Sequence, residues 1–145
     1  MKKLRIYLTK VNLLLMTLLL CSSSLLAQKE RPLTRVLFIF DASQSMYTNW
    51  KDGSRMDIAK VLLSNMLDSL RGQELVEVGL RVYGHQFPVP PQKCNDTRLE
   101  VGFGTNKIDQ IQARLKTLKP KGTTPIAESI SKGAYDFPKC DNCRN

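Results

Sequence analysis

Residues 36–45 read VLFIFDASQS, and this stretch does most to define the fold. Five apolar residues, 36–40, come directly before an acid and two hydroxyls at alternate positions, Asp41, Ser43 and Ser45. A continuous apolar run is typical of a strand covered on both faces of a parallel sheet. In open α/β sheets, ligands bind outside the carboxyl ends of the strands. We therefore expect these three oxygen-bearing side chains to converge there on a hard divalent cation such as Mg²⁺.

Three helices are predicted from apolar residues at helical spacing. The first covers residues 55–70. The second is capped by Asn106 and ended by Pro120, and the third begins at Pro125 and stops before Pro138. The residues expected to face the core are Ala59, Leu62, Leu63, Met66, Leu67 and Leu70, then Ile108, Ile111, Leu115 and Leu118, then Ile126, Ile130 and Ala134.

Two further strands are predicted between the first and second helices. In residues 76–83 apolar side chains alternate with others, which indicates a strand with one buried face, and residues 99–103 alternate as a short edge strand. The proline-rich residues 87–91 form the loop between them. The order β-α-β-β-α-α predicts an α/β fold, with an open, mostly parallel, Rossmann-like sheet and helices on both faces.

Residues 1–27 are predicted to be a secretory signal peptide. A basic start precedes a Leu-rich segment, residues 11–20, which is shorter than the roughly 20 residues of a membrane span, and Ala27 is a small residue at the cleavage point. Acylation at Cys21 and a retained anchor are the alternatives. The mature chain is expected to be secreted, periplasmic or on the cell surface, without a transmembrane span.

The mature chain is predicted to hold a short linker, residues 28–34, and the N-terminal part of one domain, residues 35–145. Another parallel strand should follow the last helix, so we expect the C-terminal strands to be missing from this chain. Its 145 residues, 42% of them hydrophobic, provide for one modest core.

Charge and cysteine content limit the classes of function. The net charge is +9, but four of the 22 basic residues and none of the 13 acids lie in residues 1–27. The remaining basic residues have no aromatic series beside them, so no nucleic-acid partner is expected. After export, structural disulfides are the favoured interpretation of Cys94, Cys140 and Cys143. One C-x-x-C and one histidine are weak evidence for zinc or redox chemistry.

A second loop should reach the first motif. Gly122-Thr123-Thr124-Pro125 precedes the last helix, and glycine allows a close approach of the backbone. Together with Asp41-x-Ser43-x-Ser45 after an apolar strand, it makes residues 33–145 resemble a von Willebrand factor type A (VWA) domain with a metal-ion-dependent adhesion site.

The resemblance implies a function for these residues. It implies that Asp41, Ser43, Ser45 and Thr124 hold Mg²⁺ or Mn²⁺, directly or through water, with Thr124 preferred over Thr123. It further implies a protein partner that presents an acidic residue to the ion. The family has another metal-site aspartate after the next strand, which has no counterpart here.

Several alternatives remain open. Asp41 could instead form a turn or act as the phosphoryl-accepting nucleophile of a Mg²⁺-dependent enzyme, although Ser43 stands where such enzymes place a second acid. The domain could also be structural, with an inactive metal site. Thr124 could cap the last helix.

Three further side chains lie outside these motifs: Tyr47 and Trp50 just after the first motif, and His85 after the predicted strand of residues 76–83. His85 is expected to be an exposed loop residue rather than a ligand. Tyr47 and Trp50 could rim a binding surface or pack against the protein.

Overall fold

The computed structural model describes residues 31–51, 53–140 and 143–144, together with residues 5, 8, 10–13, 15 and 16. Cys21, Ala27 and most of the predicted signal peptide therefore lie outside the described residues. The chain divides into two units, Met1–Arg31 and Pro32–Asn145. Within the described residues, no helix has the length and apolar character needed to cross a membrane.

A four-stranded sheet forms the centre of the second unit. Its strands are β1 (Leu33–Asp41), β4 (Val76–Tyr83), β5 (Thr97–Gly104) and β6 (Cys143–Arg144), in the order β5-β4-β1-β6. β1 runs parallel to β4 and β6, whereas β4 and β5 are antiparallel. The predicted α/β class is confirmed, with a mixed sheet that has an antiparallel strand at one edge.

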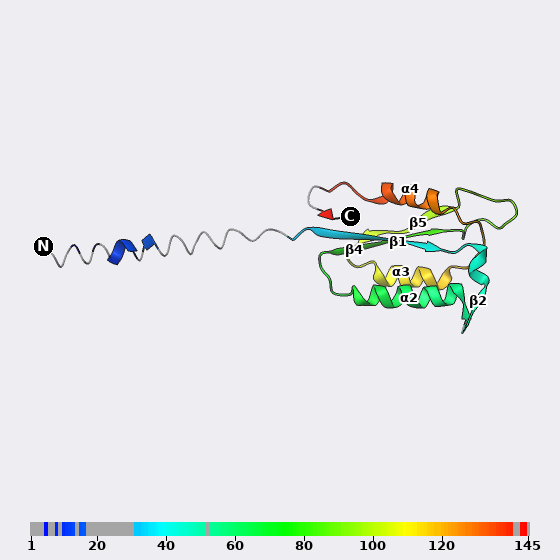
Figure 1. Ribbon diagram of the computed structural model, residues 1–145, viewed down its shortest axis with the longest axis horizontal. Helices are drawn as coiled ribbons and strands as arrows, with labels where there is room; N and C mark the ends of the chain where they lie inside the picture. The colour runs from blue at the N-terminus through cyan, green and yellow to red at the C-terminus, as the bar shows by residue number, and fades with distance from the viewer. Residues whose placement is uncertain are drawn as a thin grey trace. The chain divides into compact units, whose positions relative to one another are not determined.

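Helices cover both faces of this sheet (Figure 1). α2 (Arg55–Ser69) and α3 (Ile108–Thr117) lie together on one face, and α4 (Ile126–Asp136) lies on the other. A 3-10 helix, η1 (Gln44–Tyr47), and a small hairpin of β2 (Asn49–Trp50) and β3 (Gly53–Ser54) connect β1 to α2. The main core contains Phe40, Met56, Leu63, Leu67, Val78, Leu80, Val82, Val101, Ile108, Ile111, Leu115 and Leu118.

The first two helices follow the predicted ranges, with changes in detail. Ser54 caps α2 by accepting a hydrogen bond from the Asp57 amide at 3.1 Å. The stripe predicted for α2 is wrong at Leu62 and Met66, which are more than half exposed. All four core residues predicted for α3 are buried, but Lys107 rather than Asn106 takes the N-cap position, without a side-chain hydrogen bond.

The orientation predicted for α4 is wrong. Ile126, Ile130 and Ala134 are exposed, whereas Ser129 and Gly133 are buried. A Cβ at Gly133 would lie 3.1 Å from a methyl group of Leu37, so glycine permits close contact between the helix and the sheet. The Ser129 hydroxyl donates to the Pro125 carbonyl at 2.7 Å, which satisfies its polar group inside the protein.

β4 is covered on both faces rather than on one. Gly79, Arg81 and Tyr83 are buried together with the apolar side chains between them. The Arg81 guanidinium can be buried because it donates to both carboxylate oxygens of Asp136, at 2.6 and 2.7 Å. The central position of β4 between β5 and β1 explains this burial.

The predicted edge strand is confirmed, because residues 99–103 belong to β5 at one edge of the sheet. The parallel strand after α4 was expected to be missing from this chain, but a two-residue strand, β6, follows α4 and pairs with β1. Cys140 and Cys143 form a disulfide at the start of β6, and Cys94 is free and exposed.

Candidate metal site at the carboxyl end of β1

The first motif leaves the sheet in a tight turn. β1 ends at Asp41, and the Ser43 amide donates to the Asp41 carboxylate at 2.7 Å. This bond is the local turn that aspartate favours, and it fixes the carboxylate over the end of the strand. Burial, and then the negative charge of Asp41, raise the pKa of Tyr83, the β4 residue paired with Asp41. The Tyr83 phenol therefore remains a neutral neighbour of that carboxylate.

The two serine hydroxyls lie close together. Ser43 Oγ and Ser45 Oγ are 3.2 Å apart, with Ser43 buried and Ser45 exposed at the start of η1. Two oxygens bound to Mg²⁺ at about 2.1 Å and at right angles are about 3.0 Å apart. The observed spacing therefore fits two neighbouring positions of an octahedral site.

The second loop lies directly against the first motif. Ser43 forms a parallel β-bridge with Gly122, and the Gln44 amide donates to the Gly122 carbonyl at 2.9 Å. The Lys121 amide in turn donates to the Ala42 carbonyl at 3.1 Å. Backbone hydrogen bonds thus hold the two predicted motifs side by side.

Gly84, which sequence reasoning did not single out, makes this contact possible. It follows β4 and has φ of 73°, a left-handed conformation that favours glycine. A Cβ there would lie 2.5 Å from the Thr123 carbonyl oxygen and 2.7 Å from the Ser43 backbone. The sequence signal that could have identified Gly84 was the presence of a glycine directly after a predicted strand.

A cavity of about 800 Å³ opens beside the two motifs. Ser45 and Thr124 both line it, so residues from both motifs face the same space. Thr124 is exposed and does not cap α4, because Pro125 takes the N-cap position without a side-chain hydrogen bond. The other lining residues are Gln44, Val89, Gln92, Cys94, Gly122, Thr123, Pro125, Ile126, Ala127 and Glu128.

The sequence did not associate Glu128 or the loop of residues 89–94 with the site. Glu128 stands in the first turn of α4 and makes only a long, exposed ion pair with Lys132, at 3.8 Å. An acid at that position was a weak signal, since acids are common in the first turn of helices. The loop is brought to the cavity by tertiary contacts that no local pattern predicts.

The available donors suit a hard cation better than a soft one. Among the described residues, no group of three or more His, Cys, Asp or Glu side chains is placed to hold a metal ion. The candidate set contains one carboxylate, Asp41, and the hydroxyls of Ser43, Ser45 and Thr124. Oxygen donors with few charges fit Mg²⁺ or Mn²⁺, which retain several waters, and do not fit zinc.

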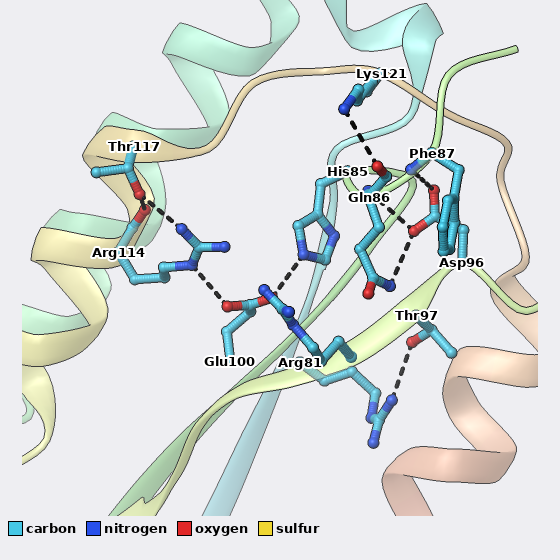
Figure 2. Close-up of polar contacts among 11 residues, drawn as sticks. Arg81, His85, Gln86, Phe87, Asp96, Thr97, Glu100, Arg114, Thr117 and Lys121 are labelled. Atoms are coloured by element: carbon cyan, nitrogen blue, oxygen red, sulfur yellow. Dashed lines mark hydrogen bonds and ion pairs between the residues drawn. The ribbon is translucent and has the colours of Figure 1, made fainter.

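The prediction that His85 is an exposed loop residue is wrong. Its side chain is 5% exposed, and Nε2 lies 2.6 Å from Glu100 (Figure 2). Glu100 also accepts hydrogen bonds from Arg98 and Arg114, at 2.6 and 2.7 Å. Burial opposes ionisation of Glu100, but hydrogen bonds from Arg98, Arg114 and His85 outweigh it and lower its pKa to about 2. Burial also lowers the pKa of His85, despite the opposing effect of Glu100.

Asp96 fixes the loop that follows His85. Its fully buried carboxylate accepts hydrogen bonds from the Gln86 amide at 3.1 Å and the Phe87 amide at 3.3 Å (Figure 2). Lys121 Nζ donates to the Gln86 carbonyl at 3.2 Å, which links this loop to the second motif. Tyr47 and Trp50 are both about 60% exposed, so neither is packed in the core.

Comparisons with known proteins find similar folds. No protein-family model matches the chain. It is 28% identical over 131 residues to "Uncharacterized protein YwmD" of Bacillus subtilis (strain 168), a match that covers 88% of this chain and 57% of that protein. The chain thus spans little more than half the length of this relative.

Solved structures match at low sequence identity. The pilus adhesin SpaC of Lactobacillus rhamnosus GG has a TM-score of 0.61 and 20% identity, covering 81% of this chain and 14% of that one. The PilB minor pilin of Streptococcus sanguinis has a TM-score of 0.58 and 22% identity, covering 74% and 27%. An uncharacterized membrane-spanning protein from Vibrio fischeri has a TM-score of 0.53 and 17% identity, covering 72% and 48%. The chain therefore shares its mixed α/β fold with parts of these larger proteins.

Proposed function

We propose that the chain is part of an exported, divalent-cation-dependent protein-binding module of the VWA type. Asp41, Ser43, Ser45 and Thr124 are the proposed metal-site residues. The observation that carries the proposal is the parallel bridge between Ser43 and Gly122, which joins two motifs far apart in the sequence. The cavity shared by Ser45 and Thr124 supports the same assignment.

Each residue has a distinct proposed role. The Ser43 and Ser45 hydroxyls supply two neighbouring oxygens, and Thr124 supplies a third from the facing loop. Asp41 is the only charged group of the set, and its bond to the Ser43 amide orients it. A bound Mg²⁺ or Mn²⁺ would supply a Lewis-acidic centre to which a partner carboxylate can bind. With a single carboxylate in the set, the ion would keep most of its charge for that partner.

The proposed partner is a protein that presents an acidic side chain. The cavity of about 800 Å³ offers space for such a side chain and its neighbours. The fold shared with a pilus adhesin and a minor pilin supports a role in binding outside the cell. A disulfide between Cys140 and Cys143 also suits an oxidising compartment. We propose a secreted, periplasmic or cell-surface location on these grounds.

We propose binding rather than catalysis. In the enzyme alternative Asp41 would accept a phosphoryl group, with a second acid nearby for proton transfer. Ser43 occupies that nearby position, and its hydroxyl is directed to Ser45 at 3.2 Å. A phosphatase assay separates the alternatives, because turnover that Asp41→Ala abolishes would favour the enzyme.

Metal titration by calorimetry tests the proposal. The chain is titrated with Mn²⁺ and Mg²⁺ beside Asp41→Ala and Thr124→Val, with Thr105→Val as a control. Thr105 is exposed in the turn before α3 and is not part of the proposed set. We expect Asp41→Ala to abolish binding and Thr124→Val to weaken it about tenfold, with no change for Thr105→Val. Equal affinities in the unmodified chain and in Asp41→Ala would reject the site.

A further inference from the structure

One edge of the central sheet is only partly covered. β1 pairs with β4 from Thr34 to Asp41, but on its other side β6 pairs with Leu33 and Thr34 alone. Residues 36–40 of β1, which we call the open window, have no strand partner on that side among the described residues. The helices lie over the two faces of the sheet (Figure 1), so they supply no backbone partners to this edge.

The open window leaves backbone groups unpaired. The amides of Thr34 and Ala42 donate to carbonyls on the β4 side, at 2.8 and 2.9 Å. Because alternate residues of a strand direct their N–H and C=O groups to opposite sides, Leu37 and Ile39 direct theirs away from β4. Within the described part of the chain, no backbone group pairs with Leu37 or Ile39 on that side. Unpaired groups along a sheet edge are a template for another strand.

The exposure of the side chains agrees with an open edge. β4 has a strand on each side, and its residues 78–83 are all buried. β1 carries a continuous apolar run, yet Phe40 is its one buried residue, and Ile39 is 38% exposed. A strand without a neighbour lacks the cross-strand side-chain contacts on that side. The open window therefore presents both apolar side chains and unpaired backbone groups to an incoming strand.

We propose that the open window pairs with the open window of a second copy of this chain. The two strands run antiparallel about a two-fold axis at Phe38, which lies opposite its own counterpart. Leu37 of each copy then lies opposite Ile39 of the other, and each such pair exchanges both N–H···O hydrogen bonds. The backbone groups directed away from β4 are satisfied in both copies, and the two sheets join into one.

The sequence around the open window selects this register. Arg35 precedes the open window and Asp41 follows it, so each lies opposite the other across the seam and no like charges meet. The Arg35 guanidinium itself remains bound to Glu77 at 2.7 Å. A shift by two residues keeps the hydrogen-bonding sides but brings Arg35 or Asp41 opposite an apolar residue of the open window. The register centred on Phe38 pairs apolar with apolar residues throughout.

The pairing has a consequence for the candidate metal site. Asp41 ends β1 in each copy, so the antiparallel strands place the two Asp41 residues at opposite ends of the seam. Six residues of extended chain separate them along the seam, which is about 20 Å. The dimer would thus present two partner-binding sites facing apart. This consequence rests on the proposed function, whereas the pairing itself does not.

Sedimentation equilibrium in EDTA tests the pairing without involving the metal site. We expect the full chain to reach twice the monomer mass as its concentration rises. Ile39→Lys places a charge in the apolar seam and should raise the dissociation constant at least about tenfold. Val61→Lys is the matched control, because Val61 is an exposed apolar residue on α2 and should have no effect. A monomer at every concentration, or association that Ile39→Lys leaves unchanged, would overturn the proposal.

Cross-linking tests the register in a Cys21→Ser, Cys94→Ser background. Residues opposite each other at a non-hydrogen-bonded position have Cα atoms about 4.5 Å apart, which a disulfide can span. Phe38→Cys should therefore yield a disulfide-linked dimer on mild oxidation. Val36→Cys is the control on the same face of the strand, because its two copies are four residues apart along the seam, about 13 Å. Equal cross-linking of the two variants would contradict the register, and thermal unfolding verifies that both are folded. If Phe38→Cys does not fold, the effect of Ile39→Lys on sedimentation decides.

Discussion

Ser43 and Gly122 are paired in a parallel β-bridge at the carboxyl end of β1. The Gln44 amide binds the Gly122 carbonyl at 2.9 Å, and the Gly122 amide binds the Gly84 carbonyl at 2.7 Å. Three segments that are separate in the sequence therefore meet through their backbones. This junction brings Ser45 of the first motif and the Gly122–Pro125 loop to one cavity, so the proposed site depends on backbone geometry as much as on its donors.

Gly84→Ala is predicted to destabilise the protein by about 3 kcal/mol. The added Cβ would overlap the Thr123 carbonyl and the Ser43 backbone, in a residue whose φ is 73°. Gly72→Ala is the matched control, because Gly72 has φ of 77° but nothing within 4 Å of its Cβ position. Gly72→Ala should lower the free energy of unfolding by only about 1 kcal/mol, from backbone strain alone. Urea denaturation measures the free energy of unfolding of both variants. Equal decreases would show that the contact of residue 84 with Ser43 is unimportant.

Glu100 is predicted to make stability depend on acid pH. Its pKa is about 2 in the folded protein, against 4.5 for an ordinary glutamate. Because the folded pKa is lowered, the ion pairs stabilise the protein fully above the ordinary value, and this contribution is lost as pH falls from about 4.5 to about 2. We expect a loss of about 2 kcal/mol over that window.

Urea denaturation at several pH values measures this loss, with two variants beside the unmodified chain. Glu100→Gln should flatten the acid decline, whereas Glu74→Gln, at an exposed residue, should leave it unchanged. If the stability of Glu100→Gln fell with acid pH as steeply as that of the unmodified chain, Glu100 would not be the cause of the pH dependence.

Cysteine chemistry provides a third prediction. In a Cys21→Ser background, alkylation without reduction should label Cys94 alone, because Cys140 and Cys143 are joined. Mass spectrometry identifies the labelled peptide. Labelling of Cys140 or Cys143 before reduction would contradict the disulfide.

Removing this disulfide should have a modest effect. Cys140 and Cys143 are three residues apart, and closing so short a loop contributes about 2 kcal/mol in the chain-entropy model. Cys143→Ser should therefore lower the free energy of unfolding by up to this amount. Cys94→Ser, at a free and exposed thiol, is the control and should change it little.

Much of the fold was predictable, because its signals are local. The apolar run before Asp41 gave a parallel strand, and the stripe of Ile108, Ile111, Leu115 and Leu118 gave a helix with its correct face. The orientation of α4 was predicted wrongly, because its two isoleucines were expected to face the core and are exposed. Close contact of its backbone with the sheet required Gly133, and a glycine carries no hydrophobic signal.

The site was predictable only in part for a related reason. Its hydroxyls and acid stand in short motifs, but Gly84, Glu128 and the loop of residues 89–94 reach it by tertiary contacts. The burial of His85 depends on ion pairs from β5 and α3, which the sequence next to His85 does not reveal. Local sequence patterns thus identify candidate donors, whereas the burial and tertiary contacts of those donors become known only from the folded structure.

The central claim is that one cation is held by both motifs, and Mn²⁺ relaxation in NMR tests it most directly. Sub-stoichiometric Mn²⁺ is added to ¹⁵N-labelled protein, and the broadening of each amide signal is measured. The account predicts that residues 41–45 and residues 122–125 broaden together at the lowest concentrations, and that Asp41→Ala abolishes both effects. Broadening confined to one motif, or centred elsewhere on the protein, would contradict it.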